Sequence, residues 1–307
     1  MPDGANPPQP LPGRPTGSRP ARLRIGIVSA GRVGAALGGA LARAGHEIVA
    51  ASAVSAASIR RAERVLPGVP IRPADEVVAA ADFVLLAVPD DALRPLITGL
   101  ASTDAWRPGQ LVAHTSGAHG IGVLDAAAAR GVLPLALHPI MTFTGRGEDV
   151  DRVAGASFGI TAPEEMRPVA EALVVEMGGE PVWVPESARP LYHAALTVGS
   201  NHLVTLVNDA LSLLASAGVE QPARLLAPLL SAALDNVLRL GDAALTGPVS
   251  RGDVATVSRH VHTLAQAAPG LLPSYLAMAR RTAERARESG QLADADANAV
   301  LAVLAQS

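Results

Sequence analysis

The sequence predicts an α/β Rossmann fold, a doubly wound and mainly parallel sheet, followed by an all-α C-terminal domain. An apolar run at Leu23–Val28 leads directly into a glycine-containing turn and an Ala/Leu/Gly-rich helix. Short apolar strands and helices then alternate as far as Val184, and beyond Pro185 only helical periodicity continues. We therefore expect a Rossmann-like domain over residues 22–185 and an all-α domain over residues 186–307.

Residues 1–21 contain seven prolines, separated by glycines and polar residues, and no apolar stretch of the kind that a signal peptide carries. This composition offers little to bury against the entropy of ordering the chain. We expect these residues to form a disordered tail.

The composition excludes several functions. The 307 residues are 49% apolar but only 2% aromatic, so Ala, Val and Leu must build the core. The formal net charge of −3 gives no electrostatic basis for binding nucleic acid or an acidic membrane surface. Cysteine is absent, which excludes disulfides, thiolate metal sites and thiol nucleophiles, and no metal site is predicted. All 25 basic residues are arginine, so no lysine amine can take part in a reaction. No apolar run approaches the roughly 18 residues of a membrane-spanning helix, and we expect a cytoplasmic protein.

The turn after the first strand resembles the phosphate-binding pattern G-x-G-x-x-G. Its six positions hold Ser29, Ala30, Gly31, Arg32, Val33 and Gly34, so a serine stands in the first glycine position. Gly31 would let backbone N–H groups approach a pyrophosphate, and Gly34 would let the following helix pack close to the strand. The alternative is an ordinary strand–helix turn that binds no nucleotide.

The end of the second strand, Glu47–Ala51, indicates which nicotinamide cofactor would bind. NAD-binding proteins place a carboxylate there to accept a hydrogen bond from the ribose 2′-hydroxyl. Here Ser52 follows the strand and Arg60 lies shortly after, with no carboxylate nearby, which favours NADP(H). The alternative is that Arg60 and its neighbour Arg61 lie on a solvated helix face.

Three further strands deliver polar groups to the carboxyl edge of the predicted sheet, where ligands bind in open α/β folds. Asp82–Val88 ends at Pro89, so Val88 and Pro89 should line the cofactor site. Gln110–His114 leads to Ser116, and Val132–Leu137 leads to His138. Either of these histidines alone would more often be structural, but both lie at the predicted ligand edge.

The helical half carries two more candidate residues. Leu191–Ala217 reads as one long helix with polar residues on one face, among them Asn201, at a position that suits a cleft or a polar contact between helices. Arg251 lies in a glycine-bounded loop and could grip a carboxylate bidentately, or it could form a surface ion pair. Asp253 is a candidate N-cap for the helix that follows.

The motifs together resemble a bacterial family of Rossmann-like proteins with a DUF2520 C-terminal domain. They are the fingerprint, LLAVPDD, HTSGA, LHPIMTF, GSNHLV and GPVSRGD, in this order. The family is related to F420-dependent NADP oxidoreductases, pyrroline-5-carboxylate reductases and the 6-phosphogluconate dehydrogenase-like group. The resemblance covers nearly the whole chain from Arg22. It implies an NADP-binding domain, an all-α second domain and a homodimer that shares its C-terminal helices. Some members are regarded as alternative ketopantoate reductases, but the catalytic lysine of the standard ketopantoate reductases is absent here.

These observations favour an NADPH-dependent oxidoreductase that reduces a small 2-oxo acid, such as a ketopantoate-like substrate, or an imine. In this hypothesis His138 is the general acid because imidazole titrates near neutral pH, and Ser116 lies by the nicotinamide. Asn201 hydrogen-bonds the reacting carbonyl and Arg251 holds the substrate carboxylate. The proton donor remains open among four histidines, which are His114, His138, His193 and His202. Two alternatives stay open: a non-catalytic NADP-binding sensor or partner-binding protein, and an F420-linked NADP oxidoreductase.

Overall fold

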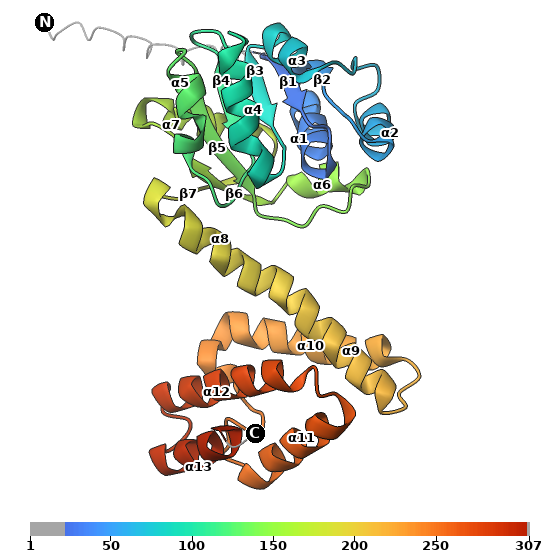
Figure 1. Ribbon diagram of the computed structural model, residues 1–307, viewed down its shortest axis with the longest axis vertical. Helices are drawn as coiled ribbons and strands as arrows, with labels where there is room; N and C mark the ends of the chain where they lie inside the picture. Colours follow the sequence, from blue (N-terminus) through green and yellow to red (C-terminus); the bar gives the residue numbers. More distant parts are fainter. Residues whose placement is uncertain (1–21, 306–307) are drawn as a thin grey trace, which may run out of the picture. The chain divides into compact units, whose positions relative to one another are not determined.

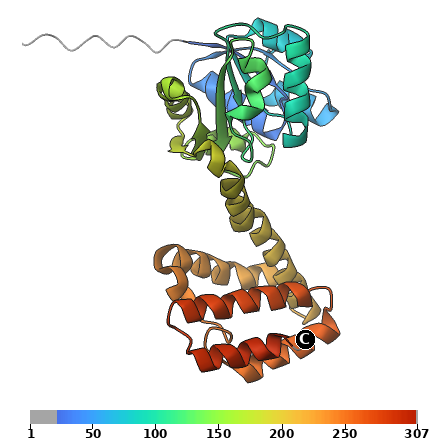
Figure 2. The same ribbon diagram turned by 60° about the vertical axis from the view of Figure 1, so that its left-hand side comes forward.

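The computed structural model describes residues 22–305 (Figures 1 and 2). The predicted tail at 1–21 lies outside the described residues. The chain forms two compact units that divide between Leu196 and Thr197, and each is described by itself. The first unit therefore extends beyond the composition change at Pro185 and includes all but the last residue of α8 (Arg189–Thr197).

The first unit contains a seven-stranded sheet in the order β2-β1-β3-β4-β5-β6-β7. Neighbouring strands are parallel except for β5 and β6, which are antiparallel. The strands are β1 (Arg24–Val28), β2 (Glu47–Ala51), β3 (Phe83–Leu86), β4 (Leu111–His114), β5 (Leu133–Pro139), β6 (Ser157–Thr161) and β7 (Glu180–Trp183). This arrangement confirms the predicted doubly wound, mainly parallel sheet.

Helices cover both faces of this sheet because successive side chains of a strand point to opposite faces. In β3, Phe83 and Leu85 pack in one core cluster, and Val84 and Leu86 pack in the other. Helices α1 (Arg32–Arg43), α6 (Glu148–Val153) and α7 (Arg167–Glu176) contribute to the first cluster. Helices α3 (Ala74–Ala80), α4 (Asp90–Ser102) and α5 (Asp125–Ala128) contribute to the second. A near-continuous apolar strand is the sequence signature of this double burial.

The remaining elements of the first unit are short or lie at its edges. They are α2 (Ala56–Val65), the 3₁₀ turns η1 (Ile121–Leu124), η2 (Glu164–Met166) and η3 (Glu186–Ala188), and α8 (Arg189–Thr197). Asp90 and Asp91 are the first two residues of α4, and no side-chain cap precedes them. Their carboxylates thus lie in the first helical turn, where negative charge is favoured by the helix dipole.

The second unit contains helices and no strands among its described residues. It comprises the π-helical turn Val198–His202, α9 (Leu203–Ser216), α10 (Pro222–Leu240), the 3₁₀ turn η5 (Gly241–Ala244), α11 (Val254–Ala267), α12 (Leu272–Glu288) and α13 (Asp294–Ala305). The predicted long helix therefore contains one π-helical turn. Asp253 caps α11 as predicted, since its carboxylate accepts a hydrogen bond from the Thr256 N–H at 3.0 Å.

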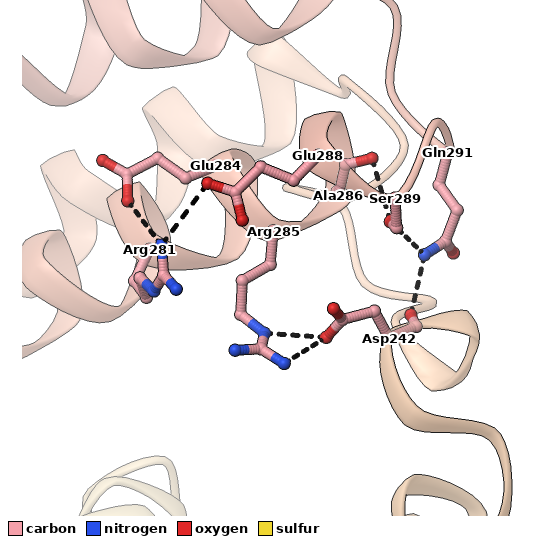
Figure 3. Close-up of polar contacts among 8 residues, drawn as sticks. All are labelled: Asp242, Arg281, Glu284, Arg285, Ala286, Glu288, Ser289 and Gln291. Atoms are coloured by element: carbon pink, nitrogen blue, oxygen red, sulfur yellow. Dashed lines mark hydrogen bonds and ion pairs between the residues drawn. The ribbon is translucent and has the colours of Figure 1, made fainter.

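The core of this unit lies among α11, α12 and α13, with Val257, Ala283 and Val300 fully buried. Polar contacts attach η5 to the end of α12 (Figure 3). Arg285 donates to Asp242 Oδ1 through Nε at 2.7 Å, and Gln291 donates to the Asp242 carbonyl at 2.7 Å. Helix α9 buries none of its side chains and α10 buries only Leu226. Within residues 22–305, no helix is both long and apolar enough to cross a membrane.

Candidate functional site

A cleft of about 440 Å³ opens at the carboxyl ends of β1, β3, β4 and β5. Its walls are Ser29, Gly31, Arg32, Val33, Ala87, Val88, Pro89, Asp90, Thr115, Ser116, Gly117, His138 and His193. Eight residues that the sequence analysis assigns to the site line this cleft: Ser29, Gly31, Arg32, Val33, Val88, Pro89, Ser116 and His138. The parallel topology brings them together because all four strands end at one edge of the sheet.

The glycine turn has the geometry of a phosphate-binding loop. Ser29 has φ of 73°, in the left-handed region that glycine usually occupies, and its N–H donates to Ser52 Oγ at 2.8 Å. A Cβ on Gly34 would collide with the Ser29 carbonyl, so this position requires glycine for α1 to pack against β1. Gly31 precedes α1 without a side-chain cap, and no acidic residue lies in the first turn. The helix N-terminus thus presents backbone N–H groups to an anion.

Three predicted cofactor residues have other positions. Ala30 is fully buried and its N–H donates to the Ser52 carbonyl at 2.7 Å, so it holds the turn in place. Ser52 supports Ser29 through its hydroxyl. Arg60 is exposed on α2, whereas its neighbour Arg61 turns towards the loop at Gly145 and donates to the Gly145 carbonyl at 3.3 Å. Arg64 donates to the same carbonyl at 2.8 Å, and the side-chain stem of Arg32, which lines the cleft, approaches Gly145. Arg32, Arg61 and Arg64 therefore meet at this loop.

His114 is a structural residue. Its Nδ1 accepts a hydrogen bond from the Ser116 N–H at 3.2 Å, so its Nε2 carries the proton and donates to the Gly120 carbonyl at 2.9 Å. The side chain has no exposed surface, and burial lowers the pKa of His114 to about 4. Both ring nitrogens are committed to the loop that follows β4, which argues against a role for His114 as proton donor.

His138 lies in a cluster that the sequence analysis finds only in part. Its Nδ1 is 2.7 Å from the hydroxyl of Tyr192, and its ring meets those of Tyr192 and His193 edge-on, with centroids 5.6 and 6.1 Å away. Burial, together with the charges of Arg189 and His193, lowers the pKa of His138 to about 4. The expectation that this imidazole titrates near neutral pH is therefore wrong: at pH 7 His138 is neutral.

Arg189 is a buried cation behind the cleft. It has no exposed surface, and its guanidinium donates to Thr161 Oγ1 at 2.8 Å and to the Gly159 carbonyl at 3.0 Å. It also donates to the carbonyls of Ser116 and Ala136, both at 3.3 Å. Burial lowers its pKa, but a guanidinium remains protonated at neutral pH. Arg189 thus links β5 and β6 to the loop that follows β4. All four of its hydrogen-bond acceptors are uncharged, so its positive charge is not neutralised by them.

Sequence reasoning missed Tyr192 and Arg189. Both lie in α8, directly after the last strand, where an arginine and a tyrosine read as an ordinary helix start. The available signal is the neighbouring His193, one of the four histidines among which the sequence leaves the proton donor open.

Asn201, His202 and Arg251 belong to the second unit. Asn201 and His202 are exposed in the π-helical turn, a distortion that often occurs at functional positions. Arg251 is exposed, and its guanidinium donates to the carbonyl of Thr246 in its own loop. These positions leave the predicted roles of Asn201 and Arg251 as proposals.

The fold and the cleft define a two-domain protein with a Rossmann-like N-terminal domain. Residues 10–139 match the family model of a Rossmann-like domain, and residues 156–282 match the domain of unknown function DUF2520. The chain is accordingly a Rossmann-like and DUF2520 domain-containing protein, as its motifs predict. No curated protein sequence matches it.

Several solved structures share the fold. A Bacteroides fragilis protein described as a candidate NADP oxidoreductase is 21% identical, with 85% of this chain and 98% of that chain covered and a TM-score of 0.71. A reductive aminase from Aspergillus terreus, in complex with NADPH and ethyl levulinate, is 18% identical, with 91% and 99% covered and a TM-score of 0.60. Plasmodium falciparum pyrroline carboxylate reductase with NADP bound is 13% identical, with 88% and 97% covered and a TM-score of 0.55. At these identities the likeness concerns the fold.

Proposed function

We propose that this protein is an NADPH-dependent oxidoreductase that reduces a small 2-oxo acid or an imine. The observation that carries the proposal is the composition of the cleft. One part of it is an uncapped helix N-terminus beside a glycine turn, and another is a polar group formed by Ser116, His138 and His193. Proteins of the same fold, such as the reductive aminase and pyrroline carboxylate reductase, have been solved with NADPH or NADP.

The residues present fit a dinucleotide phosphate. The open side of Gly31 leaves room for a pyrophosphate, whose oxygens would accept hydrogen bonds from the N–H groups at the start of α1. A 2′-phosphate lies beyond the end of β2 in Rossmann domains, and we assign its recognition to Arg32 in the cleft wall and to Arg61 on α2, the helix that follows β2. When bound, NADPH supplies the hydride.

The chain's own residues would orient the substrate and supply a proton. Val88 and Pro89 form an apolar wall of the cleft, while Ser116 and His138 provide polar groups in it. We assign proton delivery to His138. Asn201 is proposed to hydrogen-bond the reacting oxygen or nitrogen, and Arg251 to hold the substrate carboxylate.

The second unit is proposed to form a homodimer through α9 and α10, which pack against each other. Large apolar side chains are exposed on both helices: Val204 is 58%, Leu229 63% and Leu238 78% exposed. An exposed apolar surface of this kind typically marks a protein interface.

We expect Leu229→Arg to lower the sedimenting mass of the protein to that of one chain. Val175→Arg, at an exposed position of the first unit, should leave it unchanged.

Cofactor titration tests the proposed function. We expect NADPH to bind more tightly than NADH, and NADPH to be oxidised in the presence of one member of a panel of 2-oxo acids and cyclic imines. The nicotinamide absorbance band reports the reaction. Binding without turnover on the whole panel would favour a sensor, and no binding would reject both nucleotide hypotheses.

The arginines give a sharper test of the cofactor. We expect Arg32→Ala or Arg61→Ala to weaken NADPH binding about tenfold and NADH binding little, since one lost charge-assisted phosphate contact costs roughly 1.4 kcal/mol. Arg60→Ala is the matched control on the same helix and should change affinity less than about twofold. A large loss in Arg60→Ala alone would contradict the assignment to Arg61.

A further inference from the structure

The proton path to the cleft has a second member behind His138. The Nδ1 atom of His138 meets the Tyr192 hydroxyl at 2.7 Å, and the ring nitrogen on the other side, Nε2, faces Gly117 in the cleft wall. A Cβ on Gly117 would lie 2.9 Å from Nε2 and 2.6 Å from His193 Cδ2. The imidazole therefore stands between a phenol and the cleft, with one nitrogen towards each.

The backbone leaves space for this arrangement. Gly159 of β6 pairs with His138 of β5 across the antiparallel ladder. A Cβ on Gly159 would collide with the Tyr192 hydroxyl. Any side chain at residue 159 would take the space that the Tyr192 hydroxyl occupies. Glycine at this position therefore allows the phenol oxygen to lie against His138.

Arg189 places a permanent positive charge beside the phenol. Its Cζ atom lies 5.7 Å from the centroid of the Tyr192 ring, and within the described chain its guanidinium donates only to neutral acceptors. The nearby carboxylate of Glu186 accepts instead from the N–H groups of Ile121 and Gly122. A buried cation without a carboxylate partner stabilises any negative charge that forms next to it.

We propose that Tyr192, His138 and Arg189 form a proton relay that serves the cleft. This inference rests on the proposed reduction. As the substrate accepts a hydride, His138 Nε2–H gives its proton to the substrate oxygen or nitrogen, and Nδ1 takes the proton of the Tyr192 hydroxyl. The O–H bond of Tyr192 breaks, the imidazole ends as the other neutral tautomer, and the tyrosinate left behind is stabilised by Arg189. Afterwards Nε2 takes a proton from water in the cleft and Nδ1 returns its proton to the tyrosinate, which restores both the phenol and the starting tautomer. His138 is the catalytic residue, and Tyr192 and Arg189 are positioning residues that act through it.

The electrostatics agree with a neutral relay. The groups that face His138 are Arg189, His193 and Tyr192, with Asp90 acting from α4 in the opposite sense. Burial and the charges of Arg189 and His193 keep its pKa at about 4, so at neutral pH an imidazolium donor is scarce. A neutral His138 that gives up its Nε2 proton must take another at Nδ1, and the Tyr192 hydroxyl holds that proton. Burial raises the pKa of Tyr192, and Arg189 opposes that rise.

The first experiment needs neither cofactor nor substrate. The chain has two tyrosines, so the variant Tyr275→Phe leaves Tyr192 as the only phenol, and its ionisation can be followed by ultraviolet absorbance. We expect Arg189→Met in that background to raise the pKa of Tyr192 by about one unit or more, and to raise that of His138 in NMR titration. If Arg189→Met does not fold, Arg189→Lys retains the cation and should hold both values near those of the parent. Unchanged values in Arg189→Met would overturn the role of Arg189.

The second experiment uses whichever substrate the panel identifies. Tyr192→Phe should lower kcat about 100-fold while leaving the affinity for NADPH unchanged, and Tyr275→Phe should leave kcat within about twofold. Two protons move together in the relay, so a plot of the rate against the deuterium fraction of the solvent should be curved. In Tyr192→Phe this dependence should become linear. Turnover with wild-type kcat in Tyr192→Phe would reject the relay while the proposed function stands. Absence of any turnover would reject the proposed function, and the titration of Tyr192 would then decide only whether the charge coupling exists.

Discussion

Two histidine–tyrosine pairs occur in this protein, one in each compact unit, and they differ in what surrounds them. His138–Tyr192 in the first unit and His260–Tyr275 in the second both join Nδ1 to a phenol oxygen, at 2.7 and 3.1 Å. Both pairs also have edge-on rings, at 88° and 78°. The first pair borders the cleft and a buried arginine, whereas His260 is exposed on α11. The hydrogen bond alone therefore indicates no function. The cation and the adjoining cleft distinguish a candidate proton path from a surface contact.

The largest expected contrast is in turnover. We expect His138→Gln to lower kcat at least about 100-fold because it removes the last donor to the substrate, in the range typical of general acid catalysis. His260→Gln should leave kcat within about twofold. Both are measured with NADPH and the substrate that the panel identifies. Equal kcat values for the two variants would remove the distinction between the pairs.

The second contrast is the response to acid. His114 and His138 have folded-state pKa values near 4, below the ordinary 6.5, so the unfolded chain binds protons first as the pH falls. Their contribution to stability is complete above about pH 6.5 and is lost as the pH falls towards 4. For the fully buried His114 this loss amounts to roughly 2 to 3 kcal/mol between about pH 7.5 and about pH 4.5.

Urea unfolding at these two pH values tests this expectation, with His114→Asn predicted to reduce the difference and His260→Gln to leave it unchanged. A pH difference of the same size in His114→Asn would show that other groups control the acid response.

The third contrast concerns backbone space. Gly159→Ala should destabilise the first unit by about 1 to 3 kcal/mol because Tyr192 must move to admit a methyl group. Gly99→Ala is the matched control: this α4 position has no atom within 4 Å of the added Cβ, so the change should stabilise the helix by up to about 1 kcal/mol. Thermal unfolding measures both. Preserved stability in Gly159→Ala would show that the phenol is not held where the contact places it.

The smallest expected effect is on the His260–Tyr275 pair, in which His260 is exposed and Tyr275 is half-buried. Tyr275→Phe should change the free energy of unfolding by no more than about 0.5 kcal/mol, since its hydrogen bond to His260 exchanges readily with water. Denaturant titration of the full chain measures this value. If the free energy of unfolding fell by more than about 2 kcal/mol, the second pair would be a structural contact and could not serve as a control.

The sequence predicted the central strands well because β1, β3 and β4 are buried on both faces and appear as short apolar runs. The predicted second strand, Glu47–Ala51, agrees with the structure at both ends. The antiparallel direction of β6 was not available from the pattern, because alternation along a strand is the same in either direction.

The candidate site was predicted where it depends on strand ends and missed where it depends on distant contacts. Ser116 and His138 follow strands, so the topology of the fold places them. Tyr192 meets His138 across 54 residues of sequence, and no local pattern encodes that contact. Arg60 and Arg61 show a third limit: adjacent helical residues point about 100° apart, and the pattern did not fix which one faces inwards.

Gly159 has no functional group of its own, yet its identity is tied to that of Tyr192. A homologue with a smaller residue in place of this tyrosine could carry a side chain at the position of Gly159. A homologue that retains the tyrosine should retain the glycine. The two positions should therefore change together in descent. That coupled variation would separate members of the family that keep the phenol beside the histidine from those that have lost it.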